Sequence, residues 1–151
     1  MANNLFGQIE YLESEKEKYK DRFHHNQKTY KPIRNLMTIP GISLIRANII
    51  VAIVCTPERF KNKHPFWGYF SIYGNKRVHG RRELRDIFIE ATESALRSDS
   101  TLRDHYDAKV ALARKVASLT LSLLKNNETY HDDWKDKLRT RTELRKKLIK
   151  Q

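Results

Sequence analysis

Apolar residues recur along the start of the chain at alternating intervals of four and three positions. The series consists of Leu5, Ile9, Leu12, Tyr19 and Phe23, with Lys16 in the one place that is not apolar. This is the heptad pattern of a coiled-coil helix, in which a lysine lowers stability but can set register. The pattern predicts one long helix over residues 3–30. Its apolar stripe favours pairing with a second copy of the chain, and packing on the chain's own helices is the alternative.

A turn containing proline and glycine follows between two apolar segments. Pro32 suits the first turn of a helix over residues 32–37, and Ile39-Pro40-Gly41-Ile42 ends that helix. Residues 43–54 are almost wholly apolar and are expected to form the buried central helix of the domain. Proline fixes one φ and glycine permits an unusual one, so successive N–H groups can converge where the second helix begins. The sequence therefore predicts a helix-hairpin-helix unit.

Later segments complete the expected fold. Residues 64–80 mix proline and glycine with aromatic residues, which indicates irregular or only partly helical structure. Apolar spacing predicts an amphipathic helix from Arg82 to about Arg97 and a longer helix over about 101–126. Because no segment reads convincingly as a strand, the fold class is predicted to be all-α.

The chain of 151 residues is predicted to contain three parts. They are a coiled-coil arm at residues 1–31, a helix-hairpin-helix domain at 32–130 and a basic helical tail at 131–151. The apolar run before Cys55 is too short to span a bilayer, and the N-terminus lacks the features of a signal peptide. The one cysteine cannot form an internal disulfide, which fits a reducing compartment. These features predict a cytoplasmic protein with no membrane partner.

The formal net charge of +12 is concentrated in two segments. Residues 59–85 hold eight lysines and arginines against one acidic residue, and residues 135–151 hold eight against two. Two basic segments on a nearly neutral remainder indicate a surface for a polyanion such as a nucleic-acid backbone. The alternative is that the basic residues keep the protein soluble.

Candidate contacts to nucleic acid come from the hairpin and from the first basic segment. They are Pro40, Gly41, Ile42, Ser43, Lys76, Arg77, Arg81, Arg82 and Arg85. A free turn and helix start can offer N–H groups to a phosphate, and the hydroxyl of Ser43 could either contact phosphate or cap the helix. A plain connection between two helices is the alternative for the turn. No cluster of ligand residues supports a metal site.

The aromatic residues of the first basic segment have two interpretations. They are Trp67, Tyr69, Phe70 and Tyr73. Stacking on unpaired bases is one role for such residues. Packing on the second hairpin helix is the favoured interpretation.

The order of several motifs resembles that of a known family. The motifs are a heptad arm, Leu36-Met37-Thr38-Ile39-Pro40-Gly41-Ile42-Ser43, Arg59-Phe60, Phe66-Trp67-Gly68-Tyr69, Gly80-Arg81-Arg82-Glu83-Leu84-Arg85, a helix rich in small residues, and Tyr106. Over roughly residues 5–130 the chain resembles the C-terminal domain of bacterial insertion-sequence transposases with an N-terminal RuvC-like Asp-Glu-Asp-Asp nuclease domain, the group that includes the invertase Piv. The resemblance is carried by the order and spacing of the motifs together.

The resemblance implies DNA transposition by two cooperating domains. In such transposases the nuclease domain holds divalent metal, and the C-terminal domain supplies a serine, commonly in a Ser-Gly pair, that attacks DNA. This chain begins at the arm, so no cofactor is expected for it, and strand exchange by it alone is not expected. Between Tyr69 and Gly80 the only serine is Ser71, and glycine does not follow it. Ser71 is the candidate catalytic residue, and Lys76, Arg77 or His79 could activate it. A turn hydrogen bond is the alternative role of this serine.

We therefore expect the DNA-binding part of a bacterial transposase or site-specific recombinase. The expected partners are double-stranded DNA, structured RNA as a second polyanion, and another copy of the chain through the N-terminal arm. Two other classes fit the same sequence. One is a non-catalytic RNA- or DNA-binding adaptor, and the other is a helical oligomerisation protein.

Overall fold

The computed structural model describes residues 2–72, 80–97 and 109–131, and every regular element within them is helical. In chain order the elements are α1 (Ala2–Thr29), α2 (Lys31–Met37), α3 (Leu44–Val54), the 3-10 helix η1 (Pro57–Arg59), α4 (Lys63–Tyr69), α5 (Arg82–Arg97) and α6 (Lys109–Asn126). The predicted all-α fold class is confirmed. The expected helix start and basic tail at residues 98–108 and 132–151 lie outside the described residues.

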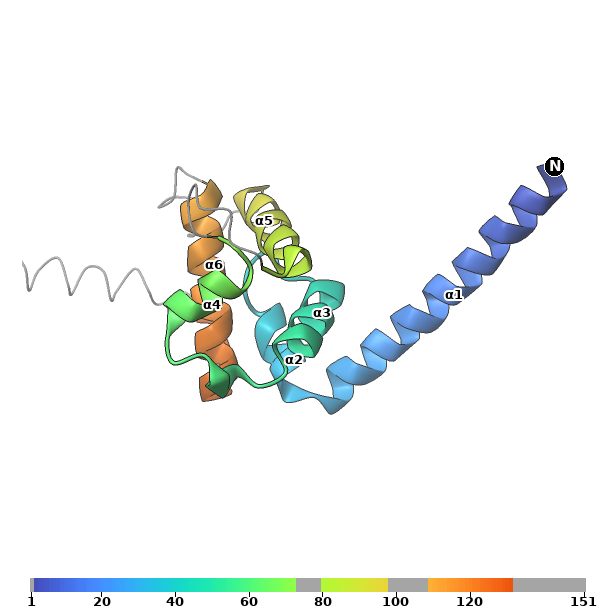
Figure 1. The fold of residues 1–151 in the computed structure, drawn as a ribbon. Helices are drawn as coiled ribbons and strands as arrows, with labels where there is room; N and C mark the ends of the chain where they lie inside the picture. Colours follow the sequence, from blue (N-terminus) through green and yellow to red (C-terminus); the bar gives the residue numbers. More distant parts are fainter. Residues whose placement is uncertain (1, 73–79, 98–108, 132–151) are drawn as a thin grey trace, which may run out of the picture.

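The first helix is a long arm that projects from a bundle of the other helices (Figure 1). It meets the bundle near its C-terminal end, where Asn26 Nδ2 donates to Asn48 Oδ1 at 3.0 Å. Arg34 Nη1 donates to the carbonyls of Gln27 and Lys28 at 3.2 and 2.6 Å, which satisfies acceptors that the end of a helix leaves free. The long helix predicted over residues 3–30 is confirmed.

The helix α3 is less buried than the sequence suggested. Its buried residues are Ala47, Asn48, Ile50 and Val54, all on one face, whereas Ile45 is 48% exposed. The sequence predicted a buried central helix, and the structure buries one face of it, because apolar composition does not require burial on every side. The centre of the bundle is instead shared with α5 and α6, which pack against each other.

Small residues of α5 and α6 are buried inside the bundle. Ala91 and Ala95 of α5 and Ala113 and Ala117 of α6 are completely buried. Small side chains let neighbouring backbones approach closely, and the turn at Gly41 meets α5 at Ala91 and Ala95. Of this pair, α5 also contacts α3, and α6 also contacts α2, η1 and α4.

The aromatic residues of α4 pack on α5 and α6. The ring centroids of Phe66 and Phe88 are 6.1 Å apart, and those of Phe70 and Phe88 are 4.8 Å apart. Trp67 Nε1 donates at 3.2 Å to the backbone carbonyl of Arg114 in α6. Packing was the favoured interpretation, with α3 as the expected neighbour, and the contacts given above for these rings are with α5 and α6. Tyr73 lies outside the described residues.

Within the described ranges, no helix combines the length and the apolar character that crossing a bilayer requires.

Candidate nucleic-acid interface

The apex of the α2–α3 hairpin packs directly on the backbone of α5. Gly41 has a φ of +88°, and a Cβ added to it would lie 2.0 Å from the carbonyl oxygen of Ala91. Side chains other than hydrogen disfavour this φ, and the space is already filled by backbone atoms. The glycine is therefore required both for the turn and for its contact with α5.

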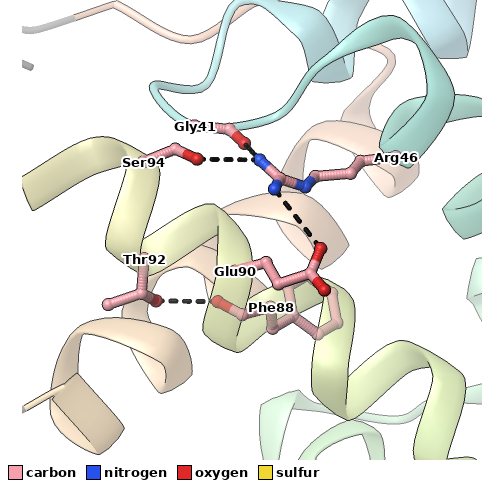
Figure 2. Close-up of polar contacts among 6 residues, drawn as sticks. All are labelled: Gly41, Arg46, Phe88, Glu90, Thr92 and Ser94. Carbon is pink, nitrogen blue, oxygen red and sulfur yellow. Dashed lines mark hydrogen bonds and ion pairs between the residues drawn. The ribbon is translucent and has the colours of Figure 1, made fainter. Parts of the chain in front are cut away.

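Arg46 of α3 stabilises this contact with hydrogen bonds. Arg46 Nη1 donates to the carbonyl oxygen of Gly41 at 2.8 Å and to Ser94 Oγ at 2.9 Å, and Nη2 lies 3.3 Å from Glu90 Oε2 (Figure 2). One guanidinium thus joins the turn to two successive turns of α5. The positive charge of Arg46 is engaged inside the protein.

The four candidate residues of the hairpin differ in exposure. Ile42 is buried, Pro40 and Gly41 are partly buried, and Ser43 is exposed. Ser43 precedes α3 with an extended backbone, but its side chain makes no capping hydrogen bond. Capping by the Ser43 hydroxyl was therefore the wrong alternative. Ser43 is the one side chain of the four that is open to solvent.

Three exposed arginines surround the start of α5. They are Arg81, Arg82 and Arg85. Arg82 and Arg85 form no ion pair with any described residue. Cations are unfavourable at a helix N-terminus, because the helix dipole is positive there and its first N–H groups are free. The sequence therefore places these charges where they lower helix stability and where an anion would be favoured.

The arginines and the hairpin apex occupy different parts of α5. Ala91, which contacts the hairpin, is nine residues beyond Arg82. That separation is about 14 Å along the axis of an α-helix. Two further candidates, Lys76 and Arg77, lie outside the described residues, as does His79.

Ser71 lies just beyond α4 beside the segment that leads into α5. Its φ is +56°, which is uncommon for a residue with a side chain, and its N–H donates to the Gly68 carbonyl at 3.2 Å. A Cβ added to Gly80 would lie 2.4 Å from Ser71 Oγ and 2.9 Å from two backbone atoms, Ser71 N and the Tyr69 carbonyl oxygen, so only glycine allows this approach. The Arg81 N–H then donates to the Tyr69 carbonyl at 2.9 Å. Ser71 and Arg81 are thereby brought together.

Two residues of this region, Arg59 and Tyr69, were not among the site residues predicted from the sequence. Arg59 Cζ lies 4.6 Å from the ring centroids of both Phe60 and Tyr69. Hydrogen bonding from Arg59, with a smaller contribution from Arg81, lowers the pKa of the Tyr69 hydroxyl, although partial burial opposes the change. Arg59 and Arg81 therefore both lie beside Tyr69, Arg59 through its guanidinium and Arg81 through its backbone N–H. The Arg59-Phe60 pair was noted in the sequence, but no local pattern indicated that Arg81 also lies beside Tyr69.

The described residues contain no group of three histidine, cysteine, aspartate or glutamate side chains suited to holding a metal ion.

Comparisons with known proteins bear on this region. No curated protein and no solved structure gave a significant match to the chain. Residues 33–107 match the family model for the transposase IS116/IS110/IS902 family, which supports a transposase family for this chain.

Proposed function

We propose that this chain binds double-stranded DNA through the phosphate backbone, as the C-terminal domain of a transposase. The family match supports a transposition-related role. The observation that carries DNA binding is the group of exposed arginines at the start of α5, Arg81, Arg82 and Arg85. Phosphate contacts of this kind supply affinity without reading the base sequence. The role of Ser71 as a nucleophile stays a prediction.

Reversing two of these charges should weaken DNA binding without weakening the fold. The double variant Arg82→Glu/Arg85→Glu removes two phosphate contacts, each worth about 0.9 in the slope of log affinity against log salt. At about 0.1 M salt the expected loss of affinity is roughly 50-fold or more. A glutamate in the first turn of α5 interacts favourably with the helix dipole, so the melting temperature should stay the same or rise. Fluorescence anisotropy with labelled duplex DNA at several salt concentrations, together with thermal unfolding, measures both effects.

The opposite end of the same helix provides the control. Arg97 is the exposed last residue of α5, and Arg97→Glu changes the net charge in the same direction. This variant should leave the salt slope nearly unchanged. Equal slopes for the double variant and the wild type would contradict the proposed interface. A marked preference for structured RNA over duplex DNA would favour the RNA-binding adaptor, and no affinity for either polymer would favour the oligomerisation protein.

We also propose that the arm pairs with a second copy of the chain. Leu5, Ile9, Leu12 and Tyr19 on its stripe are each more than half exposed. A single amphipathic helix gains most of its stability by burying such a face. In a parallel pair the heptad assignment places Glu15 opposite Lys20 of the second copy, which is the favourable arrangement of flanking charges. The lysine at position 16 would face its own copy and weaken the pair.

Substitutions at three residues of the arm test this pairing. Leu12→Lys should convert the dimer to a monomer, because it puts a second charge into the seam. Tyr11 is as exposed as Leu12, at 64%, but lies outside the stripe, so Tyr11→Lys should leave the dimer intact. Lys16→Leu should strengthen association. Sedimentation equilibrium measures the dissociation constant of each variant, and a monomeric wild type at tens of micromolar would contradict the pairing.

A further inference from the structure

Two guanidinium groups approach one phenol at the edge of the candidate interface. Arg59 ends η1, and Arg81 stands immediately before α5, so the pair comes from segments far apart in the chain. Arg59 Cζ lies 4.6 Å from the ring centroid of Tyr69 at the end of α4, and the Arg81 N–H donates to the Tyr69 carbonyl at 2.9 Å. Both arginines also lower the pKa of the Tyr69 hydroxyl. Neither arginine forms an ion pair with a carboxylate among the described residues. Two positive charges that lie near each other, with no acidic partner among the described residues, leave a local excess of positive potential.

The geometry holds Arg59 in place before any ligand arrives. Its guanidinium lies against two rings, those of Phe60 and Tyr69, each at 4.6 Å from ring centroid to Cζ. Phe60 is buried, and its ring packs edge-on to Phe66 with centroids 5.0 Å apart. A guanidinium that stacks on aromatic rings loses less rotamer freedom on forming further hydrogen bonds. Arg59 itself is exposed, and although its Nη2 donates to the Ile53 carbonyl at 3.5 Å, the remaining N–H groups at the edge of its planar group have no such partner among the described residues.

The position of Arg81 is fixed by backbone rather than by side-chain packing. Its N–H donates to the Tyr69 carbonyl, and the close approach of Gly80 to Ser71 allows this bond. Arg81 is also followed directly by the free N–H groups at the start of α5, which favour negative charge. Two arginines thus lie beside one phenol, and the second of them directly precedes the start of a helix.

We propose that Arg59, Tyr69 and Arg81 form a binding site for one phosphodiester group of duplex DNA, beside Ser71. This inference rests on the proposed function and adds Arg59 and Tyr69 to the interface. An arginine fork matches a phosphodiester with two parallel hydrogen bonds, and the phenol supplies a third donor. The cluster lies next to the arginines of α5, so the same DNA strand can contact both.

Binding of labelled duplex DNA of mixed sequence by the full chain tests the assignment. Arg59→Gln should reduce the salt slope by about 0.9 and lower affinity roughly 8-fold at about 0.1 M salt. Arg59→Lys keeps the charge but not the planar fork, so it should preserve the slope and lose a smaller part of the affinity. Tyr69→Phe keeps the ring that supports Arg59 and should lower affinity severalfold with the slope unchanged. Thermal unfolding confirms that each variant is folded.

A neighbouring lysine provides the matched control. Lys61 is exposed, lies two residues from Arg59 and makes no described contact with Tyr69, so Lys61→Gln removes one charge outside the cluster. The slope of log affinity against log salt for Lys61→Gln should equal that of the wild type. Equal effects of Arg59→Gln and Lys61→Gln would overturn the site, while a loss of binding in Arg82→Glu/Arg85→Glu would still leave the proposed function standing. An effect of Arg59→Gln on duplex RNA but not on duplex DNA would overturn DNA as the source of the phosphodiester.

The ionisation of Tyr69 gives a second measurement that does not depend on affinity. Arg59 and Arg81 hold the pKa of this phenol below its ordinary value. A bound phosphodiester would neutralise the guanidiniums and add negative charge, so DNA should raise that pKa. The pKa can be followed by NMR of ring-labelled tyrosine, with Tyr69→Phe identifying the signal. A pKa that does not move when DNA saturates the chain would overturn the site.

Discussion

Replacing Gly41 with alanine should lower the free energy of unfolding by about 3 kcal/mol or more. A left-handed backbone conformation costs a residue with a side chain roughly 1–2 kcal/mol. The new Cβ would also lie 2.0 Å from the Ala91 carbonyl oxygen and 3.2 Å from the Ala95 nitrogen. These are backbone atoms of α5, so no side-chain rotation relieves the overlap. The hairpin must move away from α5, which also separates Arg46 from its acceptors on α5.

Urea unfolding followed by circular dichroism measures this loss. Gly7 is the control, because a Cβ added there would meet nothing within 4 Å and the residue lies inside α1. Gly7→Ala should leave the bundle unchanged and raise the helicity of the arm, since alanine favours a helix by about 1 kcal/mol over glycine. A Gly41→Ala variant within about 0.5 kcal/mol of the wild type would show that the hairpin is not held against α5.

The sequence predicted the helices whose apolar period is strong. The helix from Arg82 to Arg97 has the bounds expected from its spacing, and the long N-terminal helix agrees to within one residue. The burial of α3 was overestimated, because composition alone does not reveal which face of an apolar helix meets a neighbour. Gly41 was correctly expected in a turn, yet its contact with Ala91 depends on how distant helices pack.

The candidate site was predicted only where its signal is local. The arginines around position 82 follow one another in the sequence, so their clustering at the start of a helix could be inferred. Arg59 and Tyr69 join them because Gly80 lets the chain approach Ser71. No periodicity or run of charge in the sequence indicates that Arg81 lies beside Arg59 and Tyr69 in the folded chain. Conversely, the sequence offered the hairpin and the arginines together as candidate contacts to nucleic acid, whereas the structure separates the hairpin apex from Arg82 by about 14 Å along α5.

Replacing Phe88 with alanine should be about as damaging as the change at Gly41. Phe88 is completely buried in α5, and the rings of Phe66 and Phe70 in and just after α4 both pack on it. Truncating a buried phenylalanine to alanine removes apolar contact and leaves a cavity, with a typical loss of about 3–5 kcal/mol. Because α4 is held to the bundle through these rings, the position of Tyr69 at its C-terminal end should also become less defined. Urea unfolding measures the stability, and the Tyr69 NMR signal reports the local change.

Leucine at the same position separates the volume of Phe88 from its aromatic geometry. Phe88→Leu keeps an apolar side chain in the core, so its loss should be well under that of alanine, about 1–1.5 kcal/mol. Aromatic pairs add about 0.5–1.5 kcal/mol beyond the area they bury. Phe70 and Phe88 have ring centroids 4.8 Å apart, so a double-mutant cycle with Phe70→Leu and Phe88→Leu should show a coupling free energy in that range. Additive losses would mean that these rings act as separate apolar residues, and that α4 is held on the bundle by burial alone.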